Sequence, residues 1–176
     1  METHFLTTAW RYACKAHSDT NHEYEKNVPY SYHLNMVYEV GKEFTHLIPD
    51  KDRQNVLAAC WCHDLIEDAR ETYNDVKKNT NKEVADLVFA LTNEKGKTRS
   101  ERANHRYYEG IRLIPNATFI KLCDRIANIK HGLKTGSSMV NKYRDENPHF
   151  IRQLYDPELA EMFVYLKQIL EKEVKK

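Results

Sequence analysis

Residues 60–68 read CWCHDLIED, and this segment guides the interpretation of the rest of the chain. It places the pair His63 and Asp64 at the end of an apolar, helix-forming run. An ionised aspartate is almost never buried unless it is paired or bound to a metal. Glu67 and Asp68 add two carboxylates one turn later, and clustered carboxylates repel one another unless a cation lies among them or they face water. The segment therefore predicts a functional centre at the end of a buried helix.

Two other segments interrupt an apolar pattern in the same way. His33 lies among core-type residues, and Asp124 lies within a predicted helix beside Cys123 and Ile126. Aspartate has a poor helix propensity, so its place there needs another reason. Each residue alone also fits a structural role: a hydrogen-bonded core histidine, an ion-paired aspartate or a solvated helix end. Together, two imidazoles and two carboxylates suit Mn²⁺, Fe²⁺ or Zn²⁺, with open positions for water and substrate oxygens.

The rest of the chain predicts helices, because its 176 residues include only five Gly and five Pro. Apolar residues recur at helical spacing in most segments, residues 18–30 read as a polar loop, and no convincing period-2 strand is present. The expected architecture is all-α: one helical-bundle domain, residues 1–176, of seven or eight helices. The predicted helices span residues 3–17, 31–47, 51–67, 99–113, 115–129 and 157–173, with another after a capping box at 80–83.

Three local signals mark predicted helix starts. Residues 80–83 and 98–101 each have the Thr-x-x-Glu pattern of a capping box. Asp156 followed by Pro157 is typical of an N-cap with proline at the first helical position. These signals place three of the helix boundaries.

Composition excludes several classes of protein. The net charge is +1, from 27 basic and 26 acidic residues, so no nucleic-acid polymer is expected as a partner. No apolar run approaches 18 residues, and residues 1–12 lack the features of a signal peptide, so we expect a cytoplasmic protein without a membrane span. The four cysteines stand among apolar residues and read as reduced, buried thiols: Cys14, Cys60, Cys62 and Cys123.

The order of His33, His63-Asp64 and Asp124 resembles the HD phosphohydrolase superfamily. Residues 63–68, HDLIED, resemble the HDxxED signature of its RelA/SpoT-type alarmone hydrolases. The likeness runs in order over roughly residues 5–170, and the chain resembles the small stand-alone hydrolases. Three more boxes are similar to the family's PY-x-x-H, T-x-x-K and KLADRLxN motifs: residues 28–33 (VPYSYH), 91–95 (LTNEK) and 121–128 (KLCDRIAN).

The resemblance implies a site and a reaction. The four metal ligands would be His33, His63, Asp64 and Asp124, holding one Mn²⁺, although other divalent transition metals remain open. Glu67 and Asp68, which match the family's ED pair, would orient and deprotonate the attacking water. The implied reaction is hydrolysis of the 3′-pyrophosphate of the guanosine alarmones (p)ppGpp, giving GDP or GTP and pyrophosphate.

The resemblance also indicates substrate-binding residues. Asn128 matches the family's nucleoside-contacting Asn, and Lys95 matches a Lys near the phosphates. Tyr143 is a candidate for stacking on a base. Cations that could add positive charge to the site are Arg99, Arg102, Arg125 and Lys130.

One departure keeps other substrates open. The family usually carries an Arg-Lys pair before the PY box, whereas residues 22–27 read HEYEKN here. Only Lys26 is a plausible replacement, and Tyr24 is a candidate for stacking on a base instead. The alternatives are an HD hydrolase acting on an adenosine alarmone, a 2′- or 3′-phosphorylated dinucleotide or a deoxynucleotide, and a non-enzymatic binding module. A homo-oligomer is also possible.

Overall fold

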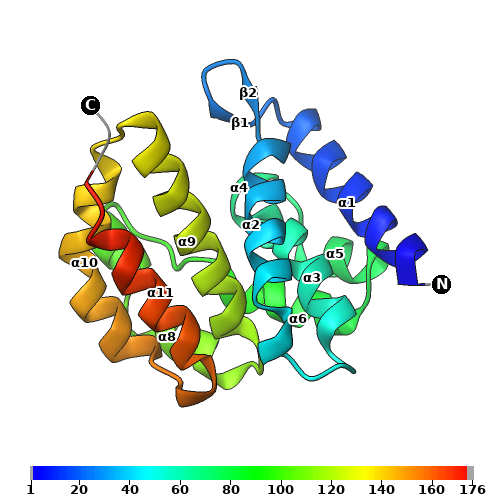
Figure 1. Cartoon of the computed structure of the whole chain (residues 1–176). Coiled ribbons are helices and arrows are strands. Elements are labelled where there is room, and N and C mark those ends of the chain that lie inside the picture. Colours follow the sequence, from blue (N-terminus) through cyan, green and yellow to red (C-terminus); the bar gives the residue numbers. More distant parts are fainter. Residues whose placement is uncertain (1, 174–176) are drawn as a thin grey trace.

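A computed structural model gives the backbone of residues 2–173 and the side chains of residues 4–173. Helices dominate these residues, and the all-α prediction is confirmed (Figure 1). The elements are α1 (Glu2–Asp19), β1 (Glu23–Glu25), β2 (Val28–Pro29), α2 (Ser31–Glu43), a 3₁₀ turn (Thr45–Leu47), α3 (Arg53–Cys62), α4 (Leu65–Asp68), α5 (Tyr73–Asn79), α6 (Lys82–Leu91), α7 (Arg99–Arg102), α8 (His105–Leu113), α9 (Ala117–Thr135), α10 (Met139–Leu154), a second 3₁₀ turn (Pro157–Leu159) and α11 (Ala160–Leu170).

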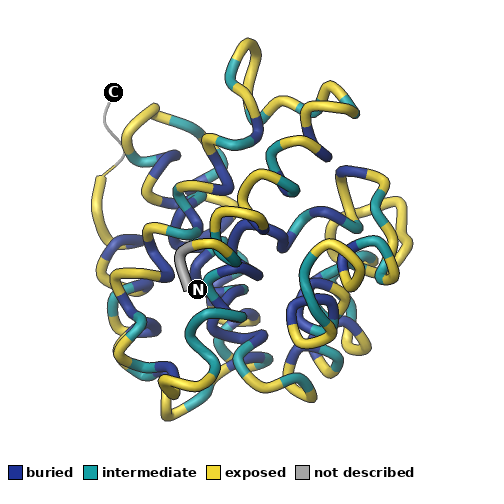
Figure 2. Tube along the Cα trace, turned by 90° about the vertical axis from the view of Figure 1, so that its right-hand side faces the viewer, coloured by how far each residue is buried: buried dark blue, intermediate teal, exposed yellow. Residues whose placement is uncertain are grey.

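The centre of the molecule is formed by α2, α3 and α9, which pack against one another. Helix α1 covers α3 on one side, and α10 and α11 cover α9 on the other, as Figure 1 shows. Figure 2 shows that the trace is buried on the sides of the helices that face the interior. Fully buried side chains such as Leu34 on α2 and Phe119 on α9 each contribute roughly 1.5–3 kcal/mol to folding.

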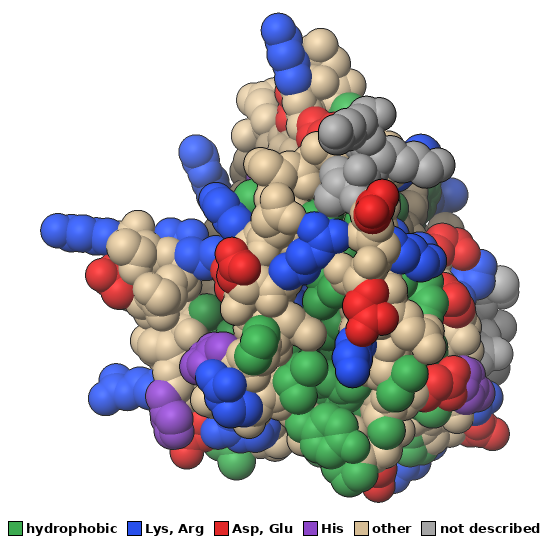
Figure 3. Space-filling model, turned by 60° about the vertical axis from the view of Figure 1, so that its left-hand side comes forward, with side chains coloured by type: hydrophobic (Ala, Val, Ile, Leu, Met, Phe, Trp, Pro, Cys, Tyr) green, Lys and Arg blue, Asp and Glu red, His purple; other side chains and the backbone are tan. Residues whose placement is uncertain are grey.

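Charge on the surface is mixed in sign. On the face shown in Figure 3, Lys and Arg side chains are interspersed with Asp and Glu side chains, as the net charge of +1 leads one to expect. No helix among residues 2–173 is long and apolar enough to cross a membrane.

The predicted helix over residues 51–67 is broken in the structure. Helix α3 ends at Cys62 with His63 as its C-cap, Asp64 has φ −100° and ψ 5°, and α4 begins at Leu65. Consecutive residues on a continuous helix point about 100° apart. The break lets the side chains of His63 and Asp64 meet, with Nε2 and Oδ2 2.9 Å apart.

The capping box predicted at 80–83 is wrong. Thr80 closes the preceding helix α5 and donates from Oγ1 to the carbonyl of Val76. Asn81 is the N-cap of α6, since its side-chain oxygen accepts from Val84 N at 2.9 Å. Asn and Thr compete for such positions because both can hydrogen-bond the backbone locally.

The other two helix starts are confirmed, although one helix is shorter than predicted. Thr98 and Glu101 form the capping box of α7, and the Asp156 side chain accepts from Glu158 N. The helix predicted over 99–113 is divided at Asn104, whose side chain accepts from Tyr107 N at 3.2 Å and caps α8. A competing N-cap inside the sequence therefore restarts the helix.

The predicted loop over residues 18–30 contains a small antiparallel hairpin. Strands β1 and β2 pair with an irregular register, Glu23 with Pro29 and Glu25 with Val28. Asn27 has φ 63°, a left-handed conformation that Asn tolerates better than most residues. The strands are too short to show a period-2 pattern, so the sequence alone did not reveal them.

Two features of the C-terminal half extend the sequence analysis. Helix α9 runs to Thr135 and ends at Gly136, which has φ 75° as expected for a helix-terminating glycine. Helix α10 was not among the predicted helices. Its buried residues recur at spacings of three and four, which is the pattern of an amphipathic helix: Val140, Tyr143, Asn147, Phe150 and Leu154.

Candidate metal centre

The structure brings together the four side chains that the sequence singled out as metal ligands. Helix α2 carries His33, the end of α3 supplies His63 and Asp64, and α9 carries Asp124. These helices lie side by side at the centre of the molecule (Figure 1). Residues 91 positions apart in the sequence therefore meet at one point.

The nitrogen and oxygen atoms of the four side chains converge closely. His33 Nε2 lies 3.3 Å from His63 Nε2. Asp64 Oδ2 lies 2.9 Å from His63 Nε2 and 3.7 Å from His33 Nε2. Asp124 Oδ1 lies 3.4 Å from His33 Nε2 and 3.8 Å from His63 Nε2. The ligand atoms of His33, His63 and Asp64 all lie within 4.8 Å of one another, the spacing of a group that could hold a metal ion.

The two imidazoles are buried and aim the same ring nitrogen at this point. His33 is 2% exposed and His63 is 3% exposed. His63 Nδ1 lies 3.0 Å from the carbonyl oxygen of Cys60, so Nδ1 carries a hydrogen and, in the neutral ring, Nε2 presents its lone pair. This backbone bond to the outer nitrogen is typical of metal-binding histidines.

The carboxylates of Asp64 and Asp124 favour a positive charge at the centre. Burial opposes ionisation of Asp64, but the neighbouring His63 outweighs it and keeps the pKa of that carboxyl well below its usual value. Burial acts to lower the pKa of His63, but Asp64 and then Asp124 outweigh it and raise that pKa to about 9. The carboxylates thus draw a proton onto a buried imidazole. A bound cation would satisfy the same demand, and the donor set fits one.

Second contacts fix both carboxylates. The Tyr30 hydroxyl donates to Asp64 Oδ2. Lys121 Nζ lies 2.9 Å from Asp124 Oδ2, and the Asn128 amide donates to Asp124 Oδ1 at 2.6 Å. Each carboxylate is therefore oriented by an outer partner, as ligating carboxylates generally are.

The two residues predicted to act on water lie on the short helix α4, beside the centre. Glu67 accepts from the Asn93 side chain at 2.6 Å and from its backbone N–H at 3.3 Å. It lines a cavity that adjoins the four convergent side chains, called the central cavity below. Asp68 is not among the residues that line this cavity. Desolvation and the charges of Asp64 and Glu67 raise the pKa of Asp68 to about 6.

A cavity of about 170 Å³ opens beside the four convergent side chains. Three predicted substrate-binding residues lie on its wall: Tyr24, Asn128 and Tyr143. Two of the predicted cations, Arg99 and Arg125, also line it.

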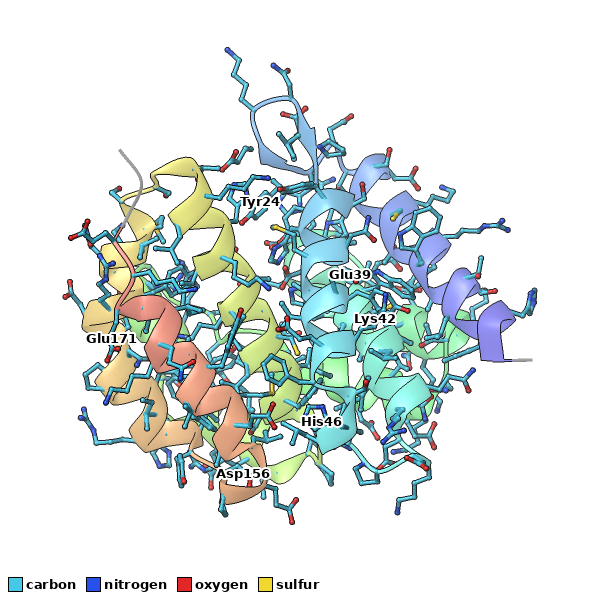
Figure 4. All side chains as sticks on the ribbon, viewed as in Figure 1. Tyr24, Glu39, Lys42, His46, Asp156 and Glu171 are labelled. Atoms are coloured by element: carbon cyan, nitrogen blue, oxygen red, sulfur yellow. The ribbon has the colours of Figure 1, made fainter. Side chains whose placement is uncertain are left out.

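Tyr24 is packed against the centre itself. Its ring stacks on His33 with centroids 4.9 Å apart and planes 7° apart, and its hydroxyl donates to Asn128 Oδ1 at 2.9 Å. In Figure 4, Tyr24 lies between α2 and α9 at the end nearest the hairpin. Tyr24 therefore closes the hairpin side of the cavity.

The structure does not bring four of the proposed cations to the centre. Lys26 on the hairpin and Lys95 on the loop after α6 are exposed, and neither lines the central cavity. Lys130 lies 3.4 Å from Glu43 and lines a different hollow, beside α2. Arg102 lines a larger, neighbouring hollow beside α8 and α10, but it does not line the central cavity.

Sequence reasoning did not single out three residues that line the central cavity. Lys121 and Tyr30 each stand three positions before a predicted ligand, Asp124 and His33 respectively, and residues three apart on a helix share a face. That spacing was an available signal. Asn93, the partner of Glu67, carried none, because the contact joins the end of α6 to α4.

Comparison with known proteins agrees with the motifs. No family model matches the chain. The curated guanosine-3′,5′-bis(diphosphate) 3′-pyrophosphohydrolase MESH1 of Drosophila melanogaster is 28% identical over 94 residues, which cover 53% of this chain and 52% of that relative. The protein of the same name from Homo sapiens is 26% identical over 125 residues, covering 71% of this chain and 68% of the relative. The chain thus spans about half to two thirds of the length of the curated relatives it matches.

A solved structure shares the fold. It is described as a metazoan ortholog of SpoT that hydrolyzes ppGpp and plays a role in starvation responses. The match has a TM-score of 0.68 and 24% identity, and it covers 93% of this chain and 92% of the other. The resemblance to HD-type alarmone hydrolases is therefore confirmed at the level of fold and of similar sequences.

Proposed function

We propose that this chain is a metal-dependent phosphohydrolase that removes the 3′-pyrophosphate of the guanosine alarmones (p)ppGpp, giving GDP or GTP and pyrophosphate. The observation that carries the proposal is the convergence of two buried imidazole nitrogens, 3.3 Å apart, with the carboxylates of Asp64, next to His63, and of Asp124 on α9. The similar proteins, which are named as 3′-pyrophosphohydrolases of guanosine-3′,5′-bis(diphosphate), point to the substrate.

The proposed metal ligands are His33, His63, Asp64 and Asp124. The mixed nitrogen and oxygen donors suit a divalent transition metal, and we propose Mn²⁺ as the native ion. Such an ion would polarise a phosphate oxygen and lower the pKa of bound water.

Glu67 and Asp68 are proposed to serve the attacking water. Glu67 lines the cavity and is held there by two hydrogen bonds from Asn93. It would accept a proton of the water as that water attacks the 3′-phosphorus. The bond from this phosphorus to the ribose 3′-oxygen breaks, pyrophosphate is released, and the 3′-oxygen takes up a proton to become the hydroxyl of GDP or GTP. Asp68, one residue further on, would assist Glu67 in orienting and deprotonating the water.

The substrate is proposed to lie against Asn128, Tyr143 and Tyr24. Asn128 bridges Tyr24 and Asp124, so its amide links the cavity wall to a proposed ligand. Tyr143 lines the cavity, and the guanidiniums of Arg99 and Arg125 lie over its ring. These contacts would orient the ribose and the base while the 3′-phosphate lies at the metal.

A direct assay tests this function. The purified protein is incubated with ppGpp and Mn²⁺, and with ppGpp and an excess of chelator, and pyrophosphate release is measured. We expect Mn²⁺-dependent release of one pyrophosphate for each GDP formed. Absence of turnover with Mn²⁺, or equal turnover with chelator, would contradict the proposal.

A second substrate class has its own supporting observation. The hairpin carries no Arg-Lys pair, Lys26 is exposed away from the cavity, and Tyr24 fills the hairpin side. An HD phosphohydrolase acting on another phosphorylated nucleotide would suit this altered wall. A panel of adenosine and guanosine 3′-phosphorylated nucleotides, assayed in parallel, ranks the two classes by kcat/KM.

We also propose that the enzyme works in the cytoplasm. All four cysteines carry free thiols, and three of them are buried. Unpaired, buried thiols are typical of a reducing compartment.

A further inference from the structure

The central cavity opens toward a larger hollow. The hollow measures about 530 Å³ and lies between the loop that carries α7, helix α8 and helices α9 and α10. The central cavity, at about 170 Å³, is smaller than the roughly 300–1,000 Å³ of common ligand pockets. A substrate bound at the metal must therefore extend beyond the cavity. The two spaces share five wall residues: Glu67, Asn93, Arg99, Lys121 and Arg125.

Three of the shared residues are cations, and Lys121 is already held by Asp124. Arg99 and Arg125 instead share one carboxylate, Glu146. Arg99 donates to it from Nε at 2.7 Å and from a terminal nitrogen at 3.2 Å, and an Arg125 terminal nitrogen lies 3.5 Å from it. One carboxylate cannot neutralise two guanidiniums, so Arg99, Arg125 and Glu146 together keep one positive charge on this part of the wall.

Arg125 is built into this wall. Its side chain is 6% exposed, it lies over the rings of Tyr143 and Phe150 at 4.9 and 4.3 Å, and it donates to the Tyr143 carbonyl at 3.0 Å. Its Nε is buried and makes no hydrogen bond to the described residues. A buried guanidinium whose donors are not all paired is costly, so Arg125 favours an acceptor on the cavity side of the wall.

Arg99 is the second arginine of this wall, and it has N–H donors available. Its side chain is half exposed, and the two bonds to Glu146 use only part of its five N–H donors. Glu146 thus orients the guanidinium and leaves donors available for an anion. Planar, forked guanidiniums match phosphate oxygens in pairs, which makes arginine a preferred phosphate-binding residue.

We infer that Arg99 and Arg125 form a second phosphate subsite, which holds the terminal phosphate of the 3′-diphosphate while the ester-linked phosphate lies at the metal. This inference rests on the proposed function. It assigns the selectivity for a diphosphate over a monophosphate to these two side chains. Lys121, which lines both spaces and pairs with Asp124, would adjoin both phosphate positions.

The experiment compares two inorganic probes that need no turnover. Pyrophosphate and orthophosphate are each titrated calorimetrically into the protein loaded with Mn²⁺, and the heat of each probe with Mn²⁺ alone is subtracted. Wild-type protein is expected to bind pyrophosphate about tenfold or more tightly than orthophosphate, since the second phosphate gains charge-assisted hydrogen bonds.

The variants identify the side chain that carries this preference. Arg99→Gln is expected to bring the ratio of the two affinities to about one while orthophosphate binding is kept. Arg99→Lys, which keeps the charge but not the fork, should give an intermediate ratio. Arg106→Gln is the matched control, because Arg106 is exposed on α8 and lines neither space. Melting temperatures verify that each variant is folded.

Three results would overturn the subsite: equal affinities in the wild-type protein, an unchanged ratio in Arg99→Gln, or equal loss of both affinities in that variant. The proposed function fails separately. If pyrophosphate is preferred through Arg99 but ppGpp is not hydrolysed, the subsite stands and the substrate assignment falls. If ppGpp is hydrolysed but the ratio of the two affinities is unchanged in Arg99→Gln, the proposed function stands and the subsite is wrong.

Discussion

The two sides of the central cavity are held in different ways. On the helical side, His33, His63 and Asp124 project from α2, α3 and α9, whose apolar faces pack on one another. On the rim, the hairpin and the loop after α6 carry exposed side chains such as Lys26 and Lys95. The difference indicates that the buried core fixes the proposed metal ligands, whereas exposed short segments form part of the rim.

The largest expected effect comes from removing a proposed metal ligand on the helical side of the cavity. Asp64→Ala should abolish ppGpp hydrolysis and weaken Mn²⁺ binding, because it removes a proposed ligand and the partner of the Tyr30 hydroxyl. Asp64 is only partly buried, so no core cavity results and the variant should still fold. Turnover and metal content are measured together with circular dichroism. Retained turnover in a folded variant would refute the assignment of the site.

The next prediction distinguishes metal binding from the proposed action of Glu67 on water. Glu67→Gln should lower kcat by about 10²-fold or more, as loss of a general base typically does, while Mn²⁺ affinity stays unchanged. The Asn93 amide can still donate to the remaining carbonyl oxygen. A fall in metal affinity with an unchanged rate per bound metal would instead make Glu67 a ligand.

A third effect concerns stability where the hairpin joins the core. His17 is 1% exposed and stacks with Tyr30 at 4.3 Å, and burial lowers its pKa to about 4. Because the folded pKa lies below that of the unfolded chain, the unfolded state binds the proton first, and stability falls as the pH drops below about 6.5. The loss should reach about 2 kcal/mol at pH 5.

Urea unfolding at pH 7.5 and pH 5 measures this loss. In His17→Asn the difference between the two pH values should shrink by a similar amount, since the titrating imidazole is gone. A variant with the same pH dependence as the wild-type protein would show that other groups cause it.

The smallest effect is expected on the rim. Tyr24→Phe removes one neutral hydrogen bond to Asn128, so KM for ppGpp should change roughly three- to tenfold with little change in kcat. Lys26→Ala should change KM less than about twofold, because surface substitutions away from such contacts are usually nearly neutral. A larger effect of Lys26 than of Tyr24 would reverse our assignment of the hairpin residues.

Local signals predicted the structure well where neighbouring residues decided it. The capping box at Thr98 and the N-cap at Asp156 are confirmed, because a cap is a contact within three residues. The same reasoning failed at Thr80, where Asn81 is the better N-cap, and at Asn104, which restarts a helix. Which of several neighbouring polar residues becomes the N-cap depends on where the chain turns into the helix.

The sequence by itself determined the all-α class and the candidate set of His and Asp side chains, because ionisable residues that interrupt several apolar, helix-forming segments are unusual. Only the tertiary structure decided how they meet. It breaks α3 so that His63 and Asp64 face one point, packs Tyr24 on His33, and joins Arg99 to Arg125 through Glu146. These contacts link residues far apart in the chain, and such distances are set by packing, which no local pattern encodes.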